Sequence, residues 1–390
     1  MLSYTERNYE KGDIMTKRIL LILFFVIAVC MSSLFFINKK EIKKSYFSNG
    51  KLQSEIFYEN DKKNGLARYF YDNGQLRLEI PYVNGKINGT FKQYFPNGNL
   101  MMSFVLRDEK TEGLLQEFYE TGQLKYEEHY LNDLLSGIAK EFYPTGILKA
   151  ETLYKDGLRN GKEILYYENG QVKEESVYKD DKLFGEKKVY STAGILKMTV
   201  PFDSNRVEGM VKMYHDNKRI KAEFPYKNGL LEGVGKEYDA QGNLIARYTF
   251  VNDKRDGLSL IFDKDGSVMF EMPYKSGKLH GVSKEYFKNG KIHSEIPYMD
   301  NMKSGIAFVY YDDGALAKRV SFENNQFSGV TKSFSRDGTL MLEVFFKDGV
   351  LVEGFSYESG KKVPLSDKEL TKMRVLKQIL FYEPKTKGYE

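Results

Sequence analysis

The chain has little of what catalytic and metal sites are usually built from. Its 390 residues include one cysteine, four histidines and no tryptophan. Cys30 is the single cysteine, so the chain can form no internal disulfide. His129, His215, His280 and His293 are far apart and show no metal-ligand or triad spacing. We therefore expect no catalytic residue, no metal site and no cofactor, and we predict that the protein is not an enzyme.

An excess of charge of one sign is also missing. The chain carries 59 basic and 54 acidic residues, a formal net charge of +5. This balance is too mild for a nucleic-acid surface, so no nucleic-acid partner is expected. Only nine prolines are present, and the 34 glycines recur at fixed positions, which excludes a low-complexity linker.

One long hydrophobic run stands near the N-terminus. Residues 1–18 are polar, residues 19–37 are mostly apolar, and residues 38–45 form a basic linker. The apolar run is long enough to span a bilayer as a helix. A first apolar segment followed by a long domain most often acts as a signal anchor. We predict a single-pass transmembrane helix over residues 19–37, a bacterial cell-membrane localisation, and repeats on the extracytoplasmic side.

Several readings of this N-terminal part stay open. Basic residues flank both sides of the run, so the positive-inside rule hardly decides the topology. Met15 is an alternative initiator. The run lacks a good cleavage site, and Val29 fits poorly before a lipidated Cys30.

A 24-residue repeat organises the rest of the chain. The residue pattern of the stretch from Gly74 to Asn97 begins again at Gly98, and the 24-residue period holds from Tyr46 to Gly349. Lys218 is the one break in this glycine series. We assign residues 46–360 to one repeat domain, because arrays grow by adding units and need no single deep core.

Each repeat reads as a β-hairpin. Two glycines per unit leave runs of six to nine residues rich in Tyr, Phe, Ile and Val, which are strands. The predicted fold is all-β: a long single-layer twisted antiparallel meander of about 13 tandem hairpins, with an N-terminal transmembrane helix and a short C-terminal capping helix. A three-residue loop over residues 72–74 is expected to pair Phe70 with Leu76. Residues on the predicted core face are Leu66, Phe70, Leu76, Ile80 and Tyr82.

Residues 361–390 are expected to cap the C-terminal end of the sheet. Ser366 and Glu369 form a capping box, and Leu365 with Leu370 forms a hydrophobic staple. The helix should run from about Asp367 to Tyr382, with an apolar stripe that closes the last hairpin.

Two rows of side chains are candidate sites. One is an aromatic row that is expected to point away from the core face. Such a row suits binding of a glycan, an extended peptide or a protein surface, although tyrosine is also simply common in strands. Its members are Tyr71, Phe95, Tyr119, Tyr143, Tyr167, Phe287 and Tyr311. A row of glutamates that includes Glu79 could be read as a cation site. Lysines at the facing positions of the repeat favour cross-strand ion pairs instead, for example Glu117 with Lys125.

The unit G-x-L-x-x-E-x-x-Y-x-x-G-x-x-x-G-x-x-x-x-Y-Y-x-x-G resembles the bacterial variant of the MORN repeat. The residues that show it here are Gly74, Leu76, Glu79, Tyr82, Gly85, Gly89, Tyr94 and Phe95. The resemblance implies a hairpin array that serves as a scaffold or binding surface. Chains of this variant are often labelled antitoxin components.

We predict a membrane-anchored repeat scaffold at the cell envelope that binds an unknown protein partner, with membrane contact through residues 19–37. One alternative is a cell-wall glycan-binding module that uses the aromatic row. The other is an antitoxin-like inhibitor of a partner toxin, which requires the opposite topology.

Overall fold

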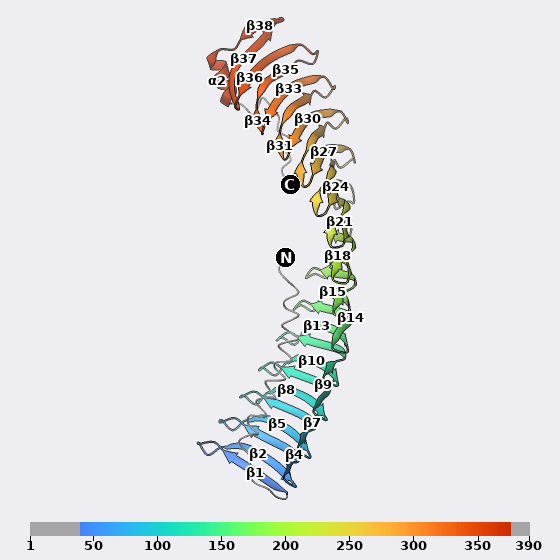
Figure 1. Ribbon diagram of the computed structural model, residues 1–390, viewed down its shortest axis with the longest axis vertical. Helices are drawn as coiled ribbons and strands as arrows, with labels where there is room; N and C mark the ends of the chain where they lie inside the picture. The colour runs from blue at the N-terminus through green and yellow to red at the C-terminus, as the bar shows by residue number, and fades with distance from the viewer. Residues whose placement is uncertain (1–39, 376–390) are drawn as a thin grey trace. The chain divides into compact units, whose positions relative to one another are not determined.

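The computed structural model describes residues 40–375 (Figure 1). It divides into two compact units, of which unit 1 ends at Gly146 and unit 2 begins at Ile147. Both are antiparallel meanders in which strands pair with their neighbours along the chain. The all-β prediction and the hairpin array are confirmed.

The strands of unit 1 are β1 (Glu41–Tyr46), β2 (Leu52–Glu59), β3 (Lys62–Lys63), β4 (Gly65–Phe70), β5 (Leu76–Val83), β6 (Lys86–Ile87), β7 (Gly89–Tyr94), β8 (Leu100–Arg107), β9 (Lys110–Phe118), β10 (Leu124–Leu131), β11 (Leu134–Leu135) and β12 (Gly137–Phe142). The first strand begins inside the segment that was predicted to be a basic linker.

The elements of unit 2 are β13 (Leu148–Lys155), β14 (Leu158–Tyr166), β15 (Val172–Lys179), β16 (Lys182–Leu183), β17 (Gly185–Tyr190), β18 (Leu196–Asp203), β19 (Arg206–Val207), β20 (Gly209–Tyr214), β21 (Ile220–Lys227), β22 (Leu230–Leu231), β23 (Gly233–Tyr238), β24 (Leu244–Val251), β25 (Lys254–Arg255), β26 (Gly257–Phe262), β27 (Val268–Lys275), β28 (Lys278–Leu279), β29 (Gly281–Tyr286), β30 (Ile292–Met299), β31 (Met302–Lys303), β32 (Gly305–Tyr310), β33 (Leu316–Glu323), β34 (Gln326–Phe327), β35 (Gly329–Phe334), β36 (Leu340–Lys347), β37 (Val350–Glu358), β38 (Lys361–Pro364) and the helix α2 (Asp367–Val375).

Two kinds of turn alternate along the chain, as β5 illustrates. Before β5, Tyr71 N–H donates to the Gln75 carbonyl at 2.8 Å, and Gly74 takes a left-handed φ of +93°. This is the predicted three-residue loop, and Phe70 pairs with Leu76 as expected. After β5, Asn84 has a φ of +52°, and with Gly85 it forms the two-residue turn that joins β5 to β6.

A bulge beside the three-residue loop corrects the predicted faces. Phe70 pairs with Leu76, but Tyr69 pairs with Leu78, so Arg77 is an extra residue in β5. The extra residue reverses the alternation of side chains. Leu66, Phe70 and Leu76 therefore share one face, here called the outer face, and the prediction that Ile80 and Tyr82 join them is wrong. The opposite face, here called the core face, carries the buried Ala67, Tyr69, Leu78, Ile80 and Tyr82.

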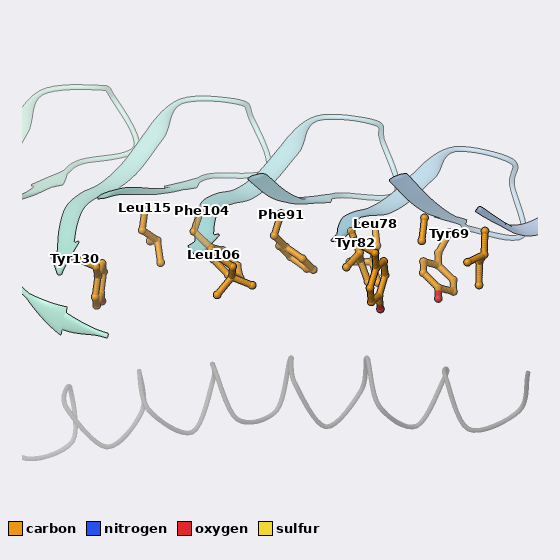
Figure 2. Packing of buried hydrophobic residues seen from close by; sticks show 11 residues of the cluster. Tyr69, Leu78, Tyr82, Phe91, Phe104, Leu106, Leu115 and Tyr130 are labelled. Carbon is orange, nitrogen blue, oxygen red and sulfur yellow. The ribbon is translucent and has the colours of Figure 1, made fainter. Parts of the chain in front are cut away.

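The core face carries the apolar clusters of both units. Figure 2 shows the cluster of unit 1, in which Tyr69, Leu78, Tyr82, Phe91, Phe104, Leu106, Leu115 and Tyr130 project from one side of the sheet. Phe91 and Phe104 stack with their ring centroids 4.8 Å apart. Unit 2 has three further clusters, centred on Ile261, Val320 and Leu351.

Proline and glycine interrupt the pairing of β27 with the strands that follow it. In β27, Pro273 offers no N–H, and its carbonyl accepts a hydrogen bond from His280 N–H at 3.0 Å. The next strand begins at Gly281, whose φ is +116°. A Cβ on Gly281 would lie 3.1 Å from the Pro273 ring, so only glycine fits this close approach.

The C-terminal cap forms as predicted within the described residues. Ser366 N–H donates to Glu369 Oε2 at 2.7 Å, and Glu369 N–H donates to Ser366 Oγ at 3.4 Å, which is a capping box. Leu370 is buried against Leu351, with Leu365 packed beside it. The predicted continuation of the helix to Tyr382 lies outside the described residues.

The expected transmembrane helix over residues 19–37 also lies outside the described residues. Between residues 40 and 375, no helix is long and apolar enough to cross a membrane. The helix α2 has nine residues, whereas a span needs about 20 apolar ones. Within the described residues this finding conflicts with a membrane-anchored fold, so the structure does not support the predicted single-pass anchor or the predicted cell-membrane localisation.

Gly281→Ala should lower the free energy of unfolding by about 2–3 kcal/mol, because the new Cβ meets the Pro273 ring at a φ that L-residues avoid. Gly290→Ala is the matched control, since Gly290 has a φ of +79° with nothing within 4 Å of the new Cβ, and about 1 kcal/mol is expected there. Urea unfolding of both variants checks this. Equal losses would show that the contact with proline does not matter.

Candidate binding surfaces

The aromatic row predicted as a binding site runs along the side of the sheet where the three-residue turns lie. Each member is the residue just before a three-residue turn, and all are half-buried. The structure brings Tyr71, Phe95, Tyr119 and Tyr143 into one row in unit 1, and places Tyr167, Phe287 and Tyr311 on the same edge of unit 2.

The hydroxyl groups of this row bond to the backbone of the next repeat. Tyr71 Oη donates to the Tyr94 carbonyl at 2.8 Å, and Tyr119 Oη donates to the Phe142 carbonyl at 2.9 Å. Tyr167 and Tyr311 make the same bond. These contacts link neighbouring repeats, so the row has a structural role. Its role in binding remains a prediction.

The glutamate row is held by two neighbours, one basic and one aromatic. Glu79 Oε1 lies 3.3 Å from Arg68 Nε, and Glu79 Oε2 accepts a hydrogen bond from Tyr94 Oη at 3.1 Å. Burial, and then the charge of Glu79, raise the pKa of Tyr94 to about 12. The expected pair Lys125–Glu117 forms at 2.7 Å. Within residues 40–375, no group of three or more His, Cys, Asp or Glu side chains could hold a metal ion.

Sequence reasoning missed a polar patch on the core face of each unit. One position of the repeat is apolar in most copies, such as Ile80, Phe104 and Met272, but holds Glu128 in unit 1 and Thr152 and Ser176 in unit 2. The signal was therefore visible as three polar residues in an apolar column. It was overlooked because the bulge at Arg77 had not been placed, so this column was not known to be the core.

In unit 1 the patch centres on Glu128. Its carboxylate accepts a hydrogen bond from Tyr130 Oη at 3.1 Å, and it pairs across the ladder with the buried Leu115. Burial raises the pKa of Glu128 to about 7, and the nearby charges of Glu117 and Glu141 act in the same direction.

In unit 2 the patch centres on Glu163, which is 9% exposed. Thr152 Oγ1 donates to Glu163 Oε1 at 3.3 Å, and Arg159 Nη1 lies 3.8 Å from the same oxygen. Glu163 Oε2 is buried without a hydrogen-bond partner. Across the ladder lies the buried Ser176. A hydrogen-bond donor supplied from outside would satisfy this oxygen.

A shallow hollow of about 720 Å³ lies in unit 2, where the repeat pattern lapses. It is lined in part by Met198, Met213 and His215, and His215 replaces the tyrosine of the aromatic row. His215 Nε2 lies 2.9 Å from the Tyr238 carbonyl, so it keeps the repeat-to-repeat contact. The nearby Lys218, with a φ of +68°, stands where the other repeats have glycine.

Tyr119→Phe should lower the free energy of unfolding by about 1 kcal/mol, since it removes one hydrogen bond and leaves the ring in place. Phe95→Tyr is the reverse change at the same phase and should add about 0.5–1 kcal/mol through a new bond to the backbone of the next repeat. Urea unfolding of both variants checks the pair. A destabilising Phe95→Tyr would contradict the proposed role of the hydroxyl groups.

The raised pKa of Glu128 predicts a stability that depends on pH. The folded state keeps the proton up to a pH of about 7, whereas the unfolded carboxyl releases it near its ordinary value of 4.5. The stabilisation is therefore present at low pH and is lost as the pH rises through 7.

Between pH 5 and pH 8, the wild type should lose about 2 kcal/mol relative to Glu128→Gln, which cannot titrate. Urea unfolding at both pH values tests this, with Glu120→Gln at an exposed turn as control. A pH-independent difference between wild type and Glu128→Gln would refute the assignment.

Comparison with solved structures finds only weak likenesses. The crystal structure of TcdB2-TccC3 is 12% identical and covers 84% of this chain and 21% of its own, with a TM-score of 0.16. The Photorhabdus luminescens Tc holotoxin pore with the mutation TccC3-D651A is 12% identical and covers 86% and 23%, with a TM-score of 0.14. The alternansucrase ASR in complex with isomaltononaose is 13% identical and covers 73% and 23%, with a TM-score of 0.16. The chain spans about a fifth of the length of these proteins, and such low scores carry no argument.

No curated protein matches the chain. The family model described as "MORN repeat variant" matches it ten times. The matched residues are 42–60, 63–84, 87–103, 111–132, 135–156, 159–180, 207–228, 231–252, 255–276 and 279–300. Together these segments cover more than half of the chain, so it belongs to the MORN repeat variant family.

Proposed function

We propose that this chain is a non-enzymatic repeat scaffold that binds a protein partner on the core face of unit 2. MORN repeats generally act as protein- or membrane-binding modules. The observation that supports a protein partner most directly is the polar patch of Thr152, Glu163 and Ser176, which stands in an otherwise largely apolar face.

The patch lowers stability unless something pairs with it. A buried polar atom without a hydrogen bond costs about 1–3 kcal/mol, and more when it is charged. Glu163 Oε2 is such an atom. A guanidinium, an ammonium or a backbone amide of a partner could donate to it. Apolar surroundings with a few fixed polar groups are the usual composition of a protein-binding site.

The paired side chains support a role without catalysis. Several tyrosines with raised pKa values donate to glutamates of neighbouring strands, as Tyr190 does to Glu175 at 3.0 Å and Tyr310 to Glu295 at 3.0 Å. The glutamates hold these hydroxyl protons within the sheet, so these tyrosines are poor candidates for proton donors to a substrate.

The other functions predicted from the sequence have less support. A glycan-binding role would use the aromatic row, whose hydroxyl groups at Tyr71, Tyr119, Tyr167 and Tyr311 already donate to backbone carbonyls. The antitoxin-like role rests on the family resemblance alone.

The test replaces the three polar residues of the patch by apolar ones in the full chain, with Thr152→Val, Glu163→Leu and Ser176→Val combined. This variant should fold at least as stably as the wild type, because it removes an unpaired buried oxygen. Affinity capture from the source cells should retain a partner on the wild type and reduce it at least tenfold on the variant.

Thr331→Val is the matched control, because Thr331 is also buried on the core face and its Oγ1 has no hydrogen-bond partner. It should capture the same partner as the wild type. Identical capture by the wild type and the triple variant would refute the proposed site.

A further inference from the structure

The outer face of unit 2 carries a mostly apolar row with one residue on each long strand, in which exposed aliphatic residues alternate with proline, threonine or serine. Register pairs place Met210 opposite Pro225, Val234 opposite Thr249, Leu258 opposite Pro273, Val282 opposite Pro297 and Ile306 opposite Ser321. We call the residues from Met210 to Ile306 in this row the outer ladder. Its five aliphatic members are 38–46% exposed.

The outer ladder is long, continuous and rigid. Strands lie about 4.8 Å apart, so the ladder from β20 to β32 extends over roughly 38 Å. Proline rings pack against glycines of the following strand, as Pro225 does against Gly233 and Pro297 against Gly305, which holds the backbone in place. The aliphatic members alone expose on the order of 300–400 Å², a contiguous area that marks interaction sites on soluble proteins.

The charges beside the ladder are balanced. On one side lie the basic residues Lys212, Lys236, Arg247 and Lys284 and the acidic residues Glu223, Glu271 and Glu295, and Lys284 lies 3.7 Å from Glu295. On the turn side, the basic residues Arg206, Lys227, Lys254, Lys275 and Lys278 are accompanied by the acidic residues Asp203, Glu208, Glu232, Asp253, Asp256 and Asp300, so the two signs nearly cancel over the whole surface. A strongly acidic or strongly basic partner therefore gains no advantage here, whereas an identical surface meets no net repulsion.

We propose that two copies of this chain associate face to face through their outer ladders. A two-fold interface needs one patch that complements itself, and a periodic apolar row with balanced flanks has this property. Two sheets packed in this way lie about 10 Å apart. The ladder and its flanks, roughly 38 Å by 20 Å, would bury about 800 Å² per copy, the area of a standard stable interface. The core face stays open, so this association is independent of the proposed partner site.

The chain itself supplies the substitutions that test this interface. Lys162 and Glu186 occupy the ladder phase four repeats before Leu258 and Val282, so the fold accepts a charge at this position. Leu258→Lys combined with Val282→Glu copies them. Leu230→Lys is the control, an equally exposed leucine at the turn edge whose repeat equivalents are Lys254 and Lys278.

The measurement is sedimentation equilibrium of the full chain over a concentration series. The wild type and Leu230→Lys should form dimers at micromolar concentration, and the double variant should dissociate at least ten times more readily with an unchanged far-UV spectrum. A monomeric wild type at 100 times that concentration, or a dimer that the double variant leaves intact, would overturn the proposal. So would a ladder that binds another protein while the chain stays monomeric.

Discussion

Hydrogen bonds between each turn and the same turn one repeat later hold the array together. At one edge, Tyr71 Oη donates to the Tyr94 carbonyl, and Asn73 Nδ2 donates to the Pro96 carbonyl at 2.9 Å. At the other edge, Leu279 N–H donates to Asn301 Oδ1 at 2.7 Å. An isolated hairpin is marginally stable at best. Contacts at both edges, worth about 1 kcal/mol each, therefore add to the strand ladders in making hairpins into a sheet.

The bulges determine which side chains lie on each face of the sheet. The extra residue at Arg77 brings Tyr69 and Leu78 together in the core, and it leaves Phe70 and Leu76 on the outer face with the ion pair of Arg68 and Glu79. Where a proline is present, as at Pro273 and Gly281, the two strands approach so closely that a side chain on the glycine would collide. One face can therefore hold buried apolar clusters while the other presents a regular, exposed row. A single sheet thus has two distinct surfaces.

The sequence predicted the period, the strands, the three-residue loop and the helix cap, because each has a strong local signal in glycine, aromatic or capping residues. It did not predict the faces. The bulge position holds Arg77, Lys125 and Lys197 in different repeats, and such residues carry no mark of an unpaired backbone. The aromatic row was found, but the use of its hydroxyl groups could not be, since a bond between repeats depends on spacing in three dimensions. The polar patch around Glu163 was hidden for the same reason as the faces.

The contacts between turns also determine how the sheet responds to mechanical force. A pull along the array strains the hydrogen bonds between neighbouring strands, and the strands separate one pair after another. The turn-to-turn bonds cross the same gaps and are loaded together with the ladders. Phe95 and Phe287 have no hydroxyl group to contribute, but in the same gaps Asn97 Nδ2 donates to the Glu120 carbonyl at 3.0 Å and Asn289 Nδ2 to the Asp312 carbonyl at 2.8 Å. Under tension these two gaps therefore keep a bond outside the strand ladder even though the tyrosine is missing.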